Sequence, residues 1–588
     1  MDFEAIRARL AKTKGKEYWR SLEELAGSEA FQESLRREFP NGASEWSDVA
    51  GRRNFLRLMG ASLALAGLTA CTRQPTETIV PYVHPALGIT LGVPLYFATA
   101  MPLGGAAEGL LVESHEGRPT KIEGNPNHPA SLGATSLFAQ ASVLTLYNPD
   151  RAHTVTNVGE IRPWGAFTDE LQRLLAEKSA SRGAGLRILT GTVSSPTLFD
   201  QIKTLAAGLP AAKWHQYEPV NRDNAMAGAR MAFGEPVNAI YRLENADVIL
   251  SLDADFLACG PASLRYARDF ANRRRLLDGD REMNRLYVVE GSMTNTGAVA
   301  DHRFPLRPSE IEGFAREVAA GLGIQAGVQS GNAQTKWRRW IDPLARDLQQ
   351  HRGRSLVIAG DSQPPAVHAL AHVMNQALGN AGATVVYVAP LEADPVDQTQ
   401  SLSELARDMD AGQVDLLVIA GGNPVYDAPA DLKFAERMSK VKTRVQLSLF
   451  HDETSELCHW HIPESHYLET WSDARAYDGA VTIIQPLIAP LYESKSAHEL
   501  LAALSGRPQQ SGYEIVRDYW MGRRGAKAQP AQTPPPIPAR VQNEQEAAQV
   551  ITQLQARPQP TAFDQWWQEV LRKGIAPDTA FQPKQVSA

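Results

Sequence analysis

Apolar runs of strand length recur along the chain between residues 186 and 450. They read LRILTG, ADVILSLDA, LYVVEG, SLVIAG, TVVYVAP, VDLLVIAGG and RVQLSLF, and amphipathic stretches of helix length separate many of them. Continuously apolar strands that alternate with helices are typical of parallel sheets buried on both faces. We therefore expect an α/β fold with parallel α/β layers, in two successive domains over 151–345 and 346–510, the second with a return segment.

Two differently patterned stretches flank this region. On one side, LLVES and TKIEG enclose the turn HEGRP, in which Gly117 can adopt a positive φ, so we expect a hairpin in a small β-rich domain over 86–150. On the other side, 511–588 combines the proline-rich linker AKAQPAQTPPPIPAR with a last helix. Trp566 and Trp567 of that helix need burial, either on the body of this chain or on a partner subunit.

Small or polar turns follow several of the apolar runs. They read TGTVSSP, EGSMTNTG, AGDSQP, AGGNP and HDETSE. Ligands of doubly wound sheets bind beyond the carboxyl ends of the strands, so these turns, with Asp361, Asn423 and Asp452 among them, can line one cleft. Taken singly, each turn is also ordinary for an α/β loop.

The stretch 51–71 reads GRRNFLRLMGASLALAGLTAC. Arg52 and Arg53 precede an uncharged run, 58–70, which is too short to span a bilayer and suits the apolar part of a signal peptide. The arginine pair resembles the export signal of the twin-arginine pathway, and the segment ending at Cys71 resembles a lipoprotein box in which the thiol is acylated. The alternatives are a basic-flanked core helix and an ordinary cysteine.

About fifty residues, 1–50, come before this signal as a leader. An apolar helical face can form there from Leu22, Leu25, Phe31, Leu35 and Phe39. Either the leader serves a chaperone or partner before export, or export departs from the usual rule. After the signal, 72–85 is a polar, proline-containing tether.

Charge and cysteine content narrow the function classes. The 588 residues carry a net charge of −7, which gives no reason to expect nucleic acid as a partner. The three cysteines, Cys71, Cys259 and Cys458, show no C-x-x-C spacing typical of zinc or iron–sulfur sites. We interpret Cys259 and Cys458 as unpaired core thiols, with a disulfide between them as the alternative.

Four histidines, His451, His459, His461 and His466, crowd near Cys458. On a strand His459 and His461 would face the same side, which permits a metal pair, but their spacing matches no standard zinc pattern. We prefer hydrogen-bonded structural histidines. The chain shows no nucleophile elbow, P-loop or convincing G-x-G-x-x-G motif, so no catalytic residue, metal ligand or cofactor-binding residue is assigned.

Several pieces in a fixed order resemble the molybdopterin oxidoreductase family over roughly 86–500. They are GLLVESHEGRPTKIEGNPNHPASLG, LYNPDR, ENADVILSLDADF, ADHRFPLRPSE, VIAGGNPVYDAP and ETSELCHWHIPESHYLE. The resemblance implies a molybdopterin-oxidoreductase-like multi-domain fold.

A narrower resemblance is to the molybdopterin-oxidoreductase-like subunits of alternative complex III, a membrane quinol:cytochrome c oxidoreductase. It is carried by YWRSLEELA, RRNFLRLMGASLALAGLTAC and HWHIPESHYLETWSDARAYDG. In such subunits the fold is kept and the molybdenum site is lost. The implied partners are an iron–sulfur ferredoxin-like polypeptide, multihaem and monohaem cytochrome c subunits, and integral membrane quinol-binding subunits. Iron–sulfur clusters and haem c then belong to the partners, with no cofactor in this chain.

Ligands of the active relatives are missing from this sequence. The fourth cluster cysteine of those relatives corresponds to Ser136, and 72–258 contains no cysteine. The molybdenum-ligand region, about 216–230, has none either, and Asp223 is the nearest alternative ligand. The fourth, barrel-like domain of the family also lacks a counterpart, so we expect either a split gene or a fragment.

We therefore expect a non-catalytic scaffold on the periplasmic face of the bacterial inner membrane, lipid-anchored and bound in a respiratory complex. The first alternative is an active molybdenum or tungsten bis-pterin oxidoreductase that lacks the N-terminal cluster. The second is a free periplasmic binding protein that uses the α/β cleft.

Overall fold

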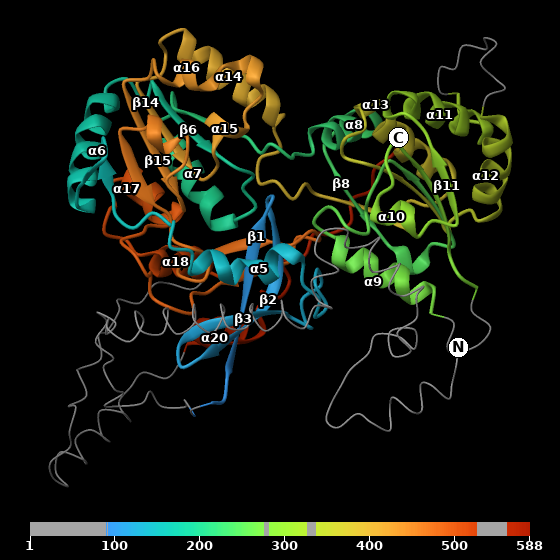
Figure 1. The fold of residues 1–588 in the computed structure, drawn as a ribbon, viewed down its shortest axis with the longest axis horizontal. Coiled ribbons are helices and arrows are strands. Elements are labelled where there is room, and N and C mark those ends of the chain that lie inside the picture. Colours follow the sequence, from blue (N-terminus) through green and yellow to red (C-terminus); the bar gives the residue numbers. More distant parts are fainter. Residues whose placement is uncertain (1–89, 91, 276–281, 326–336, 526–560) are drawn as a thin grey trace, which may run out of the picture. The chain divides into compact units, whose positions relative to one another are not determined.

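The computed structural model (Figure 1) describes residues 90, 92–275, 282–325, 337–525 and 561–588, which all belong to the unit 88–588. The predicted leader, export signal, tether and proline-rich linker lie outside the described residues, and they include 1–50, Arg52, Arg53, Cys71, 72–85 and 526–540. Within the described part of the chain, no helix is both long and apolar enough to cross a bilayer.

The first sheet is antiparallel and has the strand order β1-β2-β3. Its strands are β1 (Leu95–Leu103), β2 (Ala106–His115) and β3 (Arg118–Gly124). Glu116 and Gly117 have φ values of 53° and 83° between β2 and β3, which confirms the predicted hairpin. Helix α5 (Leu137–Leu146) covers one face of the sheet through a core that includes Leu110, Val112, Ile122, Ala139 and Leu146.

The largest sheet has seven strands in the order β5-β4-β16-β15-β14-β6-β7, and the five from β16 to β7 are parallel. The strands are β4 (Thr156–Asn157), β5 (Glu160–Ile161), β6 (Leu186–Thr190), β7 (Lys213–Gln216), β14 (Leu416–Ala420), β15 (Thr443–Ser448) and β16 (Trp460–Pro463). The covering helices are α6 (Trp164–Ser179), α7 (Pro196–Gly208), α14 (Gln398–Asp410), α16 (Phe434–Met438) and α17 (Ala497–Leu504).

Both faces of this sheet are buried, which explains the continuously apolar strands. In β14, Leu416 and Val418 pack with α6, α7 and α17, whereas Leu417 and Ile419 pack with α14 and α16 on the opposite face. Successive side chains of a strand alternate between faces, so a strand with both faces buried is largely apolar along its length. The predicted parallel α/β layers are confirmed.

A second parallel sheet has the order β11-β10-β9-β12. Its strands are β9 (Val248–Leu252), β10 (Arg285–Glu290), β11 (His302–Pro305) and β12 (Ser355–Ala359), and the surrounding helices are α8 (Asp223–Phe233), α9 (Ser263–Arg273), α11 (Pro308–Gly321), α12 (Arg338–Gln350) and α13 (Pro365–Ala377). Leu250 faces α11, α12 and α13, whereas Ile249 faces α8 and α9. Beside this sheet, β8 (Asn238–Tyr241) pairs antiparallel with β13 (Val385–Val388).

The two parallel sheets interleave along the chain. The seven-stranded sheet takes strands from both sides of 238–388, the stretch that supplies the four-stranded sheet. The expected boundary between 151–345 and 346–510 therefore falls inside the four-stranded unit, because β12 lies beyond it. The alternation of strands and helices predicts layers but carries no information on which strands pair.

The C-terminal elements close a further small core. They are β17 (Ser472–Arg475), β18 (Val481–Ile484), α18 (Gly512–Arg523) and α20 (Ala562–Lys573). Trp567 is buried against Trp471, with 6.0 Å between the ring centroids, and Trp566 is half-buried beside Trp520. The two alternatives for this tryptophan pair were burial on this chain or on a partner subunit. The described contacts are with residues of this chain. The remaining short elements are η1 (Leu243–Asn245), α10 (Asn295–Ala298), α15 (Pro424–Asp427), η2 (Ala430–Leu432) and η3 (Ser455–Leu457).

Candidate functional site

The five polar turns lie at strand carboxyl ends, but they divide between the two parallel sheets. The turns after β6, β14 and β15 belong to the seven-stranded sheet, and the turns after β10 and β12 belong to the four-stranded sheet. They therefore do not form one continuous sheet edge.

A polar network joins the ends of β6 and β7 to the start of α14. The Gln398 side chain donates from Nε2 to Thr192 Oγ1 at 2.8 Å and accepts from the Glu218 backbone N–H at 2.8 Å. The Asp223 carboxylate accepts from the backbone N–H groups of Gln398 and Thr399, each at 3.0 Å. Both Asp223 oxygens thus serve the first turn of α14, where four N–H groups lack helical partners.

An ion pair lies beside this network. Arg222 donates to the buried carboxylate of Glu392, so the segment after β7 is fastened to the segment that returns to α14. Asp361, at the end of β12, keeps an exposed surface. Desolvation raises the pKa of Asp361, Arg222 opposes that increase and Glu392 adds to it. Asp361 therefore lies near this pair of charges, and Asp223 is the neighbour of Arg222 in the sequence.

Asn423 and Asp452 hold the loops after β14 and β15 together. Asn423 donates to Glu453 at 2.6 Å and accepts from Thr454 Oγ1 at 2.7 Å. Asp452 Oδ1 accepts from the backbone N–H groups of Thr454 and Ser455 at 3.0 and 2.9 Å. These bonds stabilise the turn η3, which is a structural use of both side chains.

Ser136, at the position of the family's cluster cysteine, caps a helix. Its Oγ accepts from the Ala139 backbone N–H at 3.1 Å at the start of α5, and its own backbone N–H donates to Glu108 at 2.7 Å. A hydroxyl engaged in this way is no thiolate ligand for an iron–sulfur cluster.

The two described cysteines are free, as predicted, but Cys259 is exposed and does not belong to the core. Partial burial and the carboxylate of Asp255, 3.8 Å from its sulfur, raise the pKa of Cys259. Burial raises the pKa of Cys458 to about 12. Because the thiolate is the form that binds metals, neither group is prepared for ligation near neutral pH.

Three of the four histidines near Cys458 are hydrogen-bonded, as we expected, and the fourth, His451, lies 3.2 Å from a carboxylate oxygen of Glu456. His461 bonds to Ser448 Oγ and His466 bonds to Thr145 Oγ1, each at 3.0 Å, and His459 accepts from the Arg444 backbone N–H at 3.2 Å. Burial lowers the pKa of His461 and of His466 to about 4. Among the described residues, no group of three or more histidine, cysteine or acidic side chains is arranged to hold a metal ion.

Sequence reasoning missed a fully buried ion pair between Arg151 and Glu469. The guanidinium donates to the carboxylate through two bonds of 3.1 and 2.6 Å, and Glu469 also accepts from the backbone N–H groups of His466 and Leu491. Burial opposes ionisation of Glu469, but these donors hold its pKa below the usual value. The available signal was a charged residue in each of two distant motifs, LYNPDR and ESHYLE.

Helix α5 exposes an apolar face to solvent. Leu137, Phe138 and Leu144 are 80%, 66% and 72% exposed, and the helix contains no charged residue. Positions 137 and 144 are two turns apart and so lie on the same side. Exposed clusters of large apolar side chains are typical of interaction surfaces in soluble proteins.

The residues at the expected ligand positions can be compared with what a molybdenum or iron–sulfur site requires. The donors at the expected metal positions do not fit, because Asp223 and Ser136 serve backbone N–H groups and the described cysteines remain thiols. Several buried oxygens have no hydrogen-bond partner among the described residues, and Gln216 Oε1, Gln363 Oε1 and Glu392 Oε2 are among them. Such atoms call for water or a polar ligand. No metal-dependent step follows from this arrangement.

Comparison with known proteins agrees with the fold. No protein-family model matches the chain. Over 465 residues it is 25% identical to the menaquinone reductase, molybdopterin-binding-like subunit of Nitratidesulfovibrio vulgaris (strain Hildenborough), and the match covers 71% of this chain and 65% of that protein, just under two thirds of its length. Acetylene hydratase from Pelobacter acetylenicus matches the structure with a TM-score of 0.50 and 12% identity, over 73% of this chain and 72% of that one. The chain therefore has the predicted molybdopterin-oxidoreductase-like fold and is similar in sequence to a molybdopterin-binding-like subunit.

Proposed function

We propose that this chain is a non-catalytic scaffold subunit of a membrane-bound respiratory complex that oxidises a quinol, as alternative complex III does. The observation that carries the proposal is the 465-residue match to a subunit named for menaquinone reductase and for being molybdopterin-binding-like. The structural use of Asp223 and Ser136 supports it, because these side chains serve the backbone in place of a metal. The name of that relative describes quinone reduction, so the direction of electron flow is part of the proposal.

Metal and pterin analysis of the purified native complex tests the scaffold role. We expect no molybdenum, tungsten or fluorescent pterin oxidation product assigned to this chain, and iron–sulfur clusters only in partner polypeptides. Stoichiometric molybdenum or tungsten bound to this chain would refute the scaffold role. The direction of electron flow is tested on the same preparation. Rates of quinol oxidation and of quinone reduction are measured with donors and acceptors of known potential.

The active bis-pterin oxidoreductase is the second candidate, and one observation favours it. The partnerless buried oxygens of Gln216, Gln363 and Glu392 lie on elements at strand carboxyl ends, where a polar ligand could satisfy them. Ordered water would satisfy them equally. The pterin assay distinguishes the two occupants.

The proposed partners are an iron–sulfur ferredoxin-like polypeptide, cytochrome c subunits and integral quinol-binding subunits, at the periplasmic face of the inner membrane. The exposed apolar face of α5 supports assembly with other chains. Export is proposed to depend on Arg52 and Arg53, and an acylated Cys71 is proposed to begin the mature chain.

Mass spectrometry of the native N-terminus tests the anchor. We expect a chain that begins at acylated Cys71, and Cys71→Ser should release uncomplexed protein into the soluble fraction, because each buried CH₂ of an acyl chain contributes about 0.8 kcal/mol. Lysine at positions 52 and 53 should block export, since lysine lacks the planar guanidinium. An intact Met1 start with a free thiol at Cys71 would contradict the lipoprotein proposal.

Loop variants test whether substrate chemistry occurs at the strand ends. Asp361→Ala, Asn423→Ala and Asp452→Ala should change stability or assembly at most. Loss of the Asn423 and Asp452 hydrogen bonds should lower the free energy of unfolding by about 1–2 kcal/mol each. A fully assembled complex that has lost quinol oxidation through one of these substitutions would count against a scaffold.

A further inference from the structure

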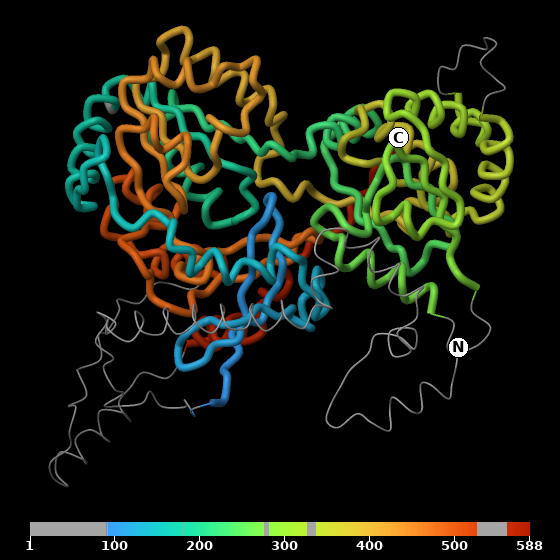
Figure 2. The backbone as a smooth tube through the Cα atoms, viewed as in Figure 1, coloured from blue at the N-terminus to red at the C-terminus, as the bar shows by residue number. Residues whose placement is uncertain are grey.

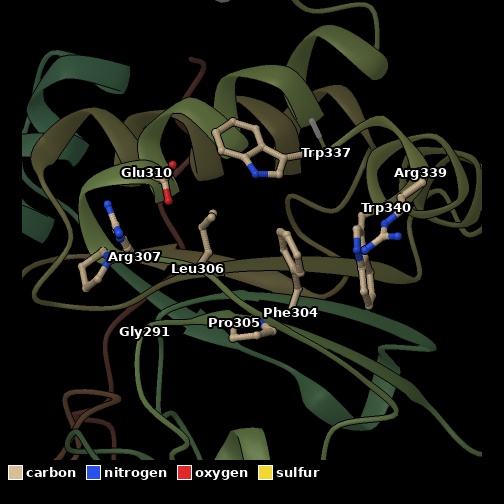
Figure 3. A pocket seen from close by; sticks show the side chains of 10 residues that line it. Gly291, Phe304, Pro305, Leu306, Arg307, Glu310, Trp337, Arg339 and Trp340 are labelled. Atoms are coloured by element: carbon tan, nitrogen blue, oxygen red, sulfur yellow. The ribbon is translucent and has the colours of Figure 1, made fainter. Parts of the chain in front are cut away.

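An aromatic pocket of about 600 Å³ opens at the carboxyl end of β11. Its walls come from the end of β11, the first turn of α11 and the first turn of α12, with Gly291 after β10 (Figure 3). Phe304, Leu306, Trp337 and Trp340 form the apolar surface. None of the polar groups that support the proposed function lies in this pocket.

The aromatic surface is anchored in the protein core. Phe304 stacks on Trp340 with 4.8 Å between ring centroids, and Phe304 and Trp337 both contact the buried ring of Phe314 at 5.8 and 6.0 Å. Rings fixed in this way lose little conformational entropy when a ligand covers them. The surface is therefore prepared for binding.

Two guanidinium groups flank these rings. Figure 3 shows Arg307 and Arg339 on opposite sides of the aromatic side chains. Both are exposed, and among the described residues neither side chain has an ion-pair or hydrogen-bond partner. The pocket lining contains one carboxylate, Glu310, so its formal charge is positive. An occupant that complements this lining carries negative charge on either side of an apolar group.

We propose that this pocket, the Arg307–Arg339 pocket, is the docking site for a partner subunit that inserts an apolar or aromatic side chain flanked by carboxylates. Tryptophan and arginine together are the composition of the energetically dominant centres of protein interfaces. The rim residues Pro305 and Pro308 are exposed along with the two arginines, so an occupant must continue beyond the pocket to cover them. A protein segment is long enough to cover these rim residues, whereas a small anion leaves them exposed to solvent. The proposal rests on the proposed function, because it requires a complex.

Charge reversal tests the pocket without disturbing the fold. Arg307 is the N-cap residue of α11 and Arg339 lies in the first turn of α12, where an acidic side chain interacts favourably with the helix dipole. The double variant Arg307→Glu/Arg339→Glu should therefore unfold at the same temperature as the natural chain. Its affinity for the partner subunits in the reconstituted complex should fall at least about tenfold, because like charges across an interface repel.

The matched control is Arg346→Glu, an exposed residue on the same helix α12 that does not line the pocket. It should leave affinity within about twofold. A photo-crosslinking amino acid at position 339 of the purified native complex should join this chain to a partner peptide that contains an aromatic residue beside Asp or Glu. The same group at position 346 should not.

The outcomes separate this proposal from the proposed function. A stable complex whose double variant binds as tightly as the natural chain, with no crosslink at 339, overturns the pocket and leaves the subunit role intact. Absence of any complex overturns the proposed function itself. A small anion released from the pocket on denaturation, and lost in the double variant, would show that the occupant is no protein.

Discussion

The buried pair of Arg151 and Glu469 is the single-residue feature with the clearest energetic consequence. Both side chains are fully removed from solvent, and four donors converge on the Glu469 carboxylate region. A buried charge that loses its partner keeps the cost of desolvation without the compensating attraction. The pair joins the segment after α5 to the segment after β16, so its loss affects two distant parts of the chain.

Glu469→Gln should lower the free energy of unfolding by about 3–5 kcal/mol, as measured by chemical denaturation, because Arg151 stays charged and buried. The control is Glu177→Gln, which breaks an exposed pair with Arg173 and should change stability by less than about 0.5 kcal/mol. Replacement of both Arg151 and Glu469 by apolar residues of similar volume should restore much of the loss. Equal effects of Glu469→Gln and Glu177→Gln would contradict this account.

Gly360 is required by close packing and not by its φ. A Cβ at this position would lie 2.0 Å from the backbone oxygen of Asp253, a non-glycine residue with φ of 57°. We expect Gly360→Ala to destabilise the chain by about 1–3 kcal/mol, the range for overpacking, because a backbone atom cannot give way as a side chain can. Gly208→Ala, where a Cβ meets no atom within 4 Å, should be neutral or stabilising. The unfolding temperatures of both variants, compared with that of the natural chain, test this difference.

Pattern alone could not find these residue-level features. AGDSQP was interpreted as a polar turn, which is correct, but nothing in it distinguishes a glycine that a neighbouring backbone requires from one that is merely permitted. Similarly, Arg151 and Glu469 are 318 residues apart, and only the fold brings them together.

Among the elements, α5 shows where amphipathic reasoning does not work. Its sequence LFAQASVLTL has no polar face, so the contrast by which a surface helix is recognised in a sequence is missing. The β2–β3 hairpin was predictable because a turn of the HEGRP type demands a positive φ, which Gly117 supplies. A helix as apolar as α5 is expected to be buried, but only the side with Ala139 and Leu146 is, whereas Leu137 and Leu144 are exposed.

Polar substitution on α5 should separate folding from association. Leu137→Gln/Leu144→Gln should leave the unfolding temperature nearly unchanged and reduce self-association of the isolated chain, measured by sedimentation, because exposed apolar area promotes aggregation. Leu146→Ala, in the fully buried face of the same helix, should instead cost about 2–5 kcal/mol. If the exposed pair were as costly as Leu146, the outward orientation of this face would be wrong.

For the whole molecule, buried histidines dominate the expected response to acid. Burial lowers the pKa of His128, His368, His461 and His466 to about 4, and that of His372 to about 3. Below the ordinary histidine pKa of 6.5 the unfolded chain binds protons that the folded chain refuses. Stability should therefore fall as the pH drops from 6.5 towards 4.

Glu464 should act in the opposite direction. Burial raises the pKa of Glu464 to about 7, so between pH 4.5 and 7 the unfolded chain loses a proton that the folded chain retains, and stability falls as the pH rises. The denaturant concentration at the unfolding midpoint should fall from pH 6.5 towards pH 4.5, because the five histidines outweigh Glu464. Glu464→Gln should raise the midpoint more at pH 8 than at pH 5. A flat profile, or an equal effect of the substitution at both pH values, would argue against these assignments.

The layered architecture was predictable from the strands, and the pairing of the sheets was not. A continuous apolar run predicts a strand that is buried on both faces. The strand β14 is an example, since helices contact both of its faces. Interleaving depends on long-range pairs such as β14 with β6, which no local pattern records. Likewise, the roles of Asp223 and Ser136 follow from backbone N–H groups that the fold brings to them.

Two chain segments run directly between the four-stranded sheet and the seven-stranded sheet, and Figure 2 shows them as neighbouring tubes. The C-terminal tail also reaches the part of the chain around the four-stranded sheet, where Lys584 pairs with Glu235. Arg222 and Asp223 on the outgoing segment are bonded to Glu392 and Gln398 on the returning segment. A single tether lets one rigid body swivel about the chain axis, whereas two tethers braced against each other resist torsion and leave bending as the softest motion. The bonds between the two segments should therefore limit twisting of one sheet relative to the other, and Glu392→Gln should loosen it, seen as broader spin-label distances, without unfolding either sheet.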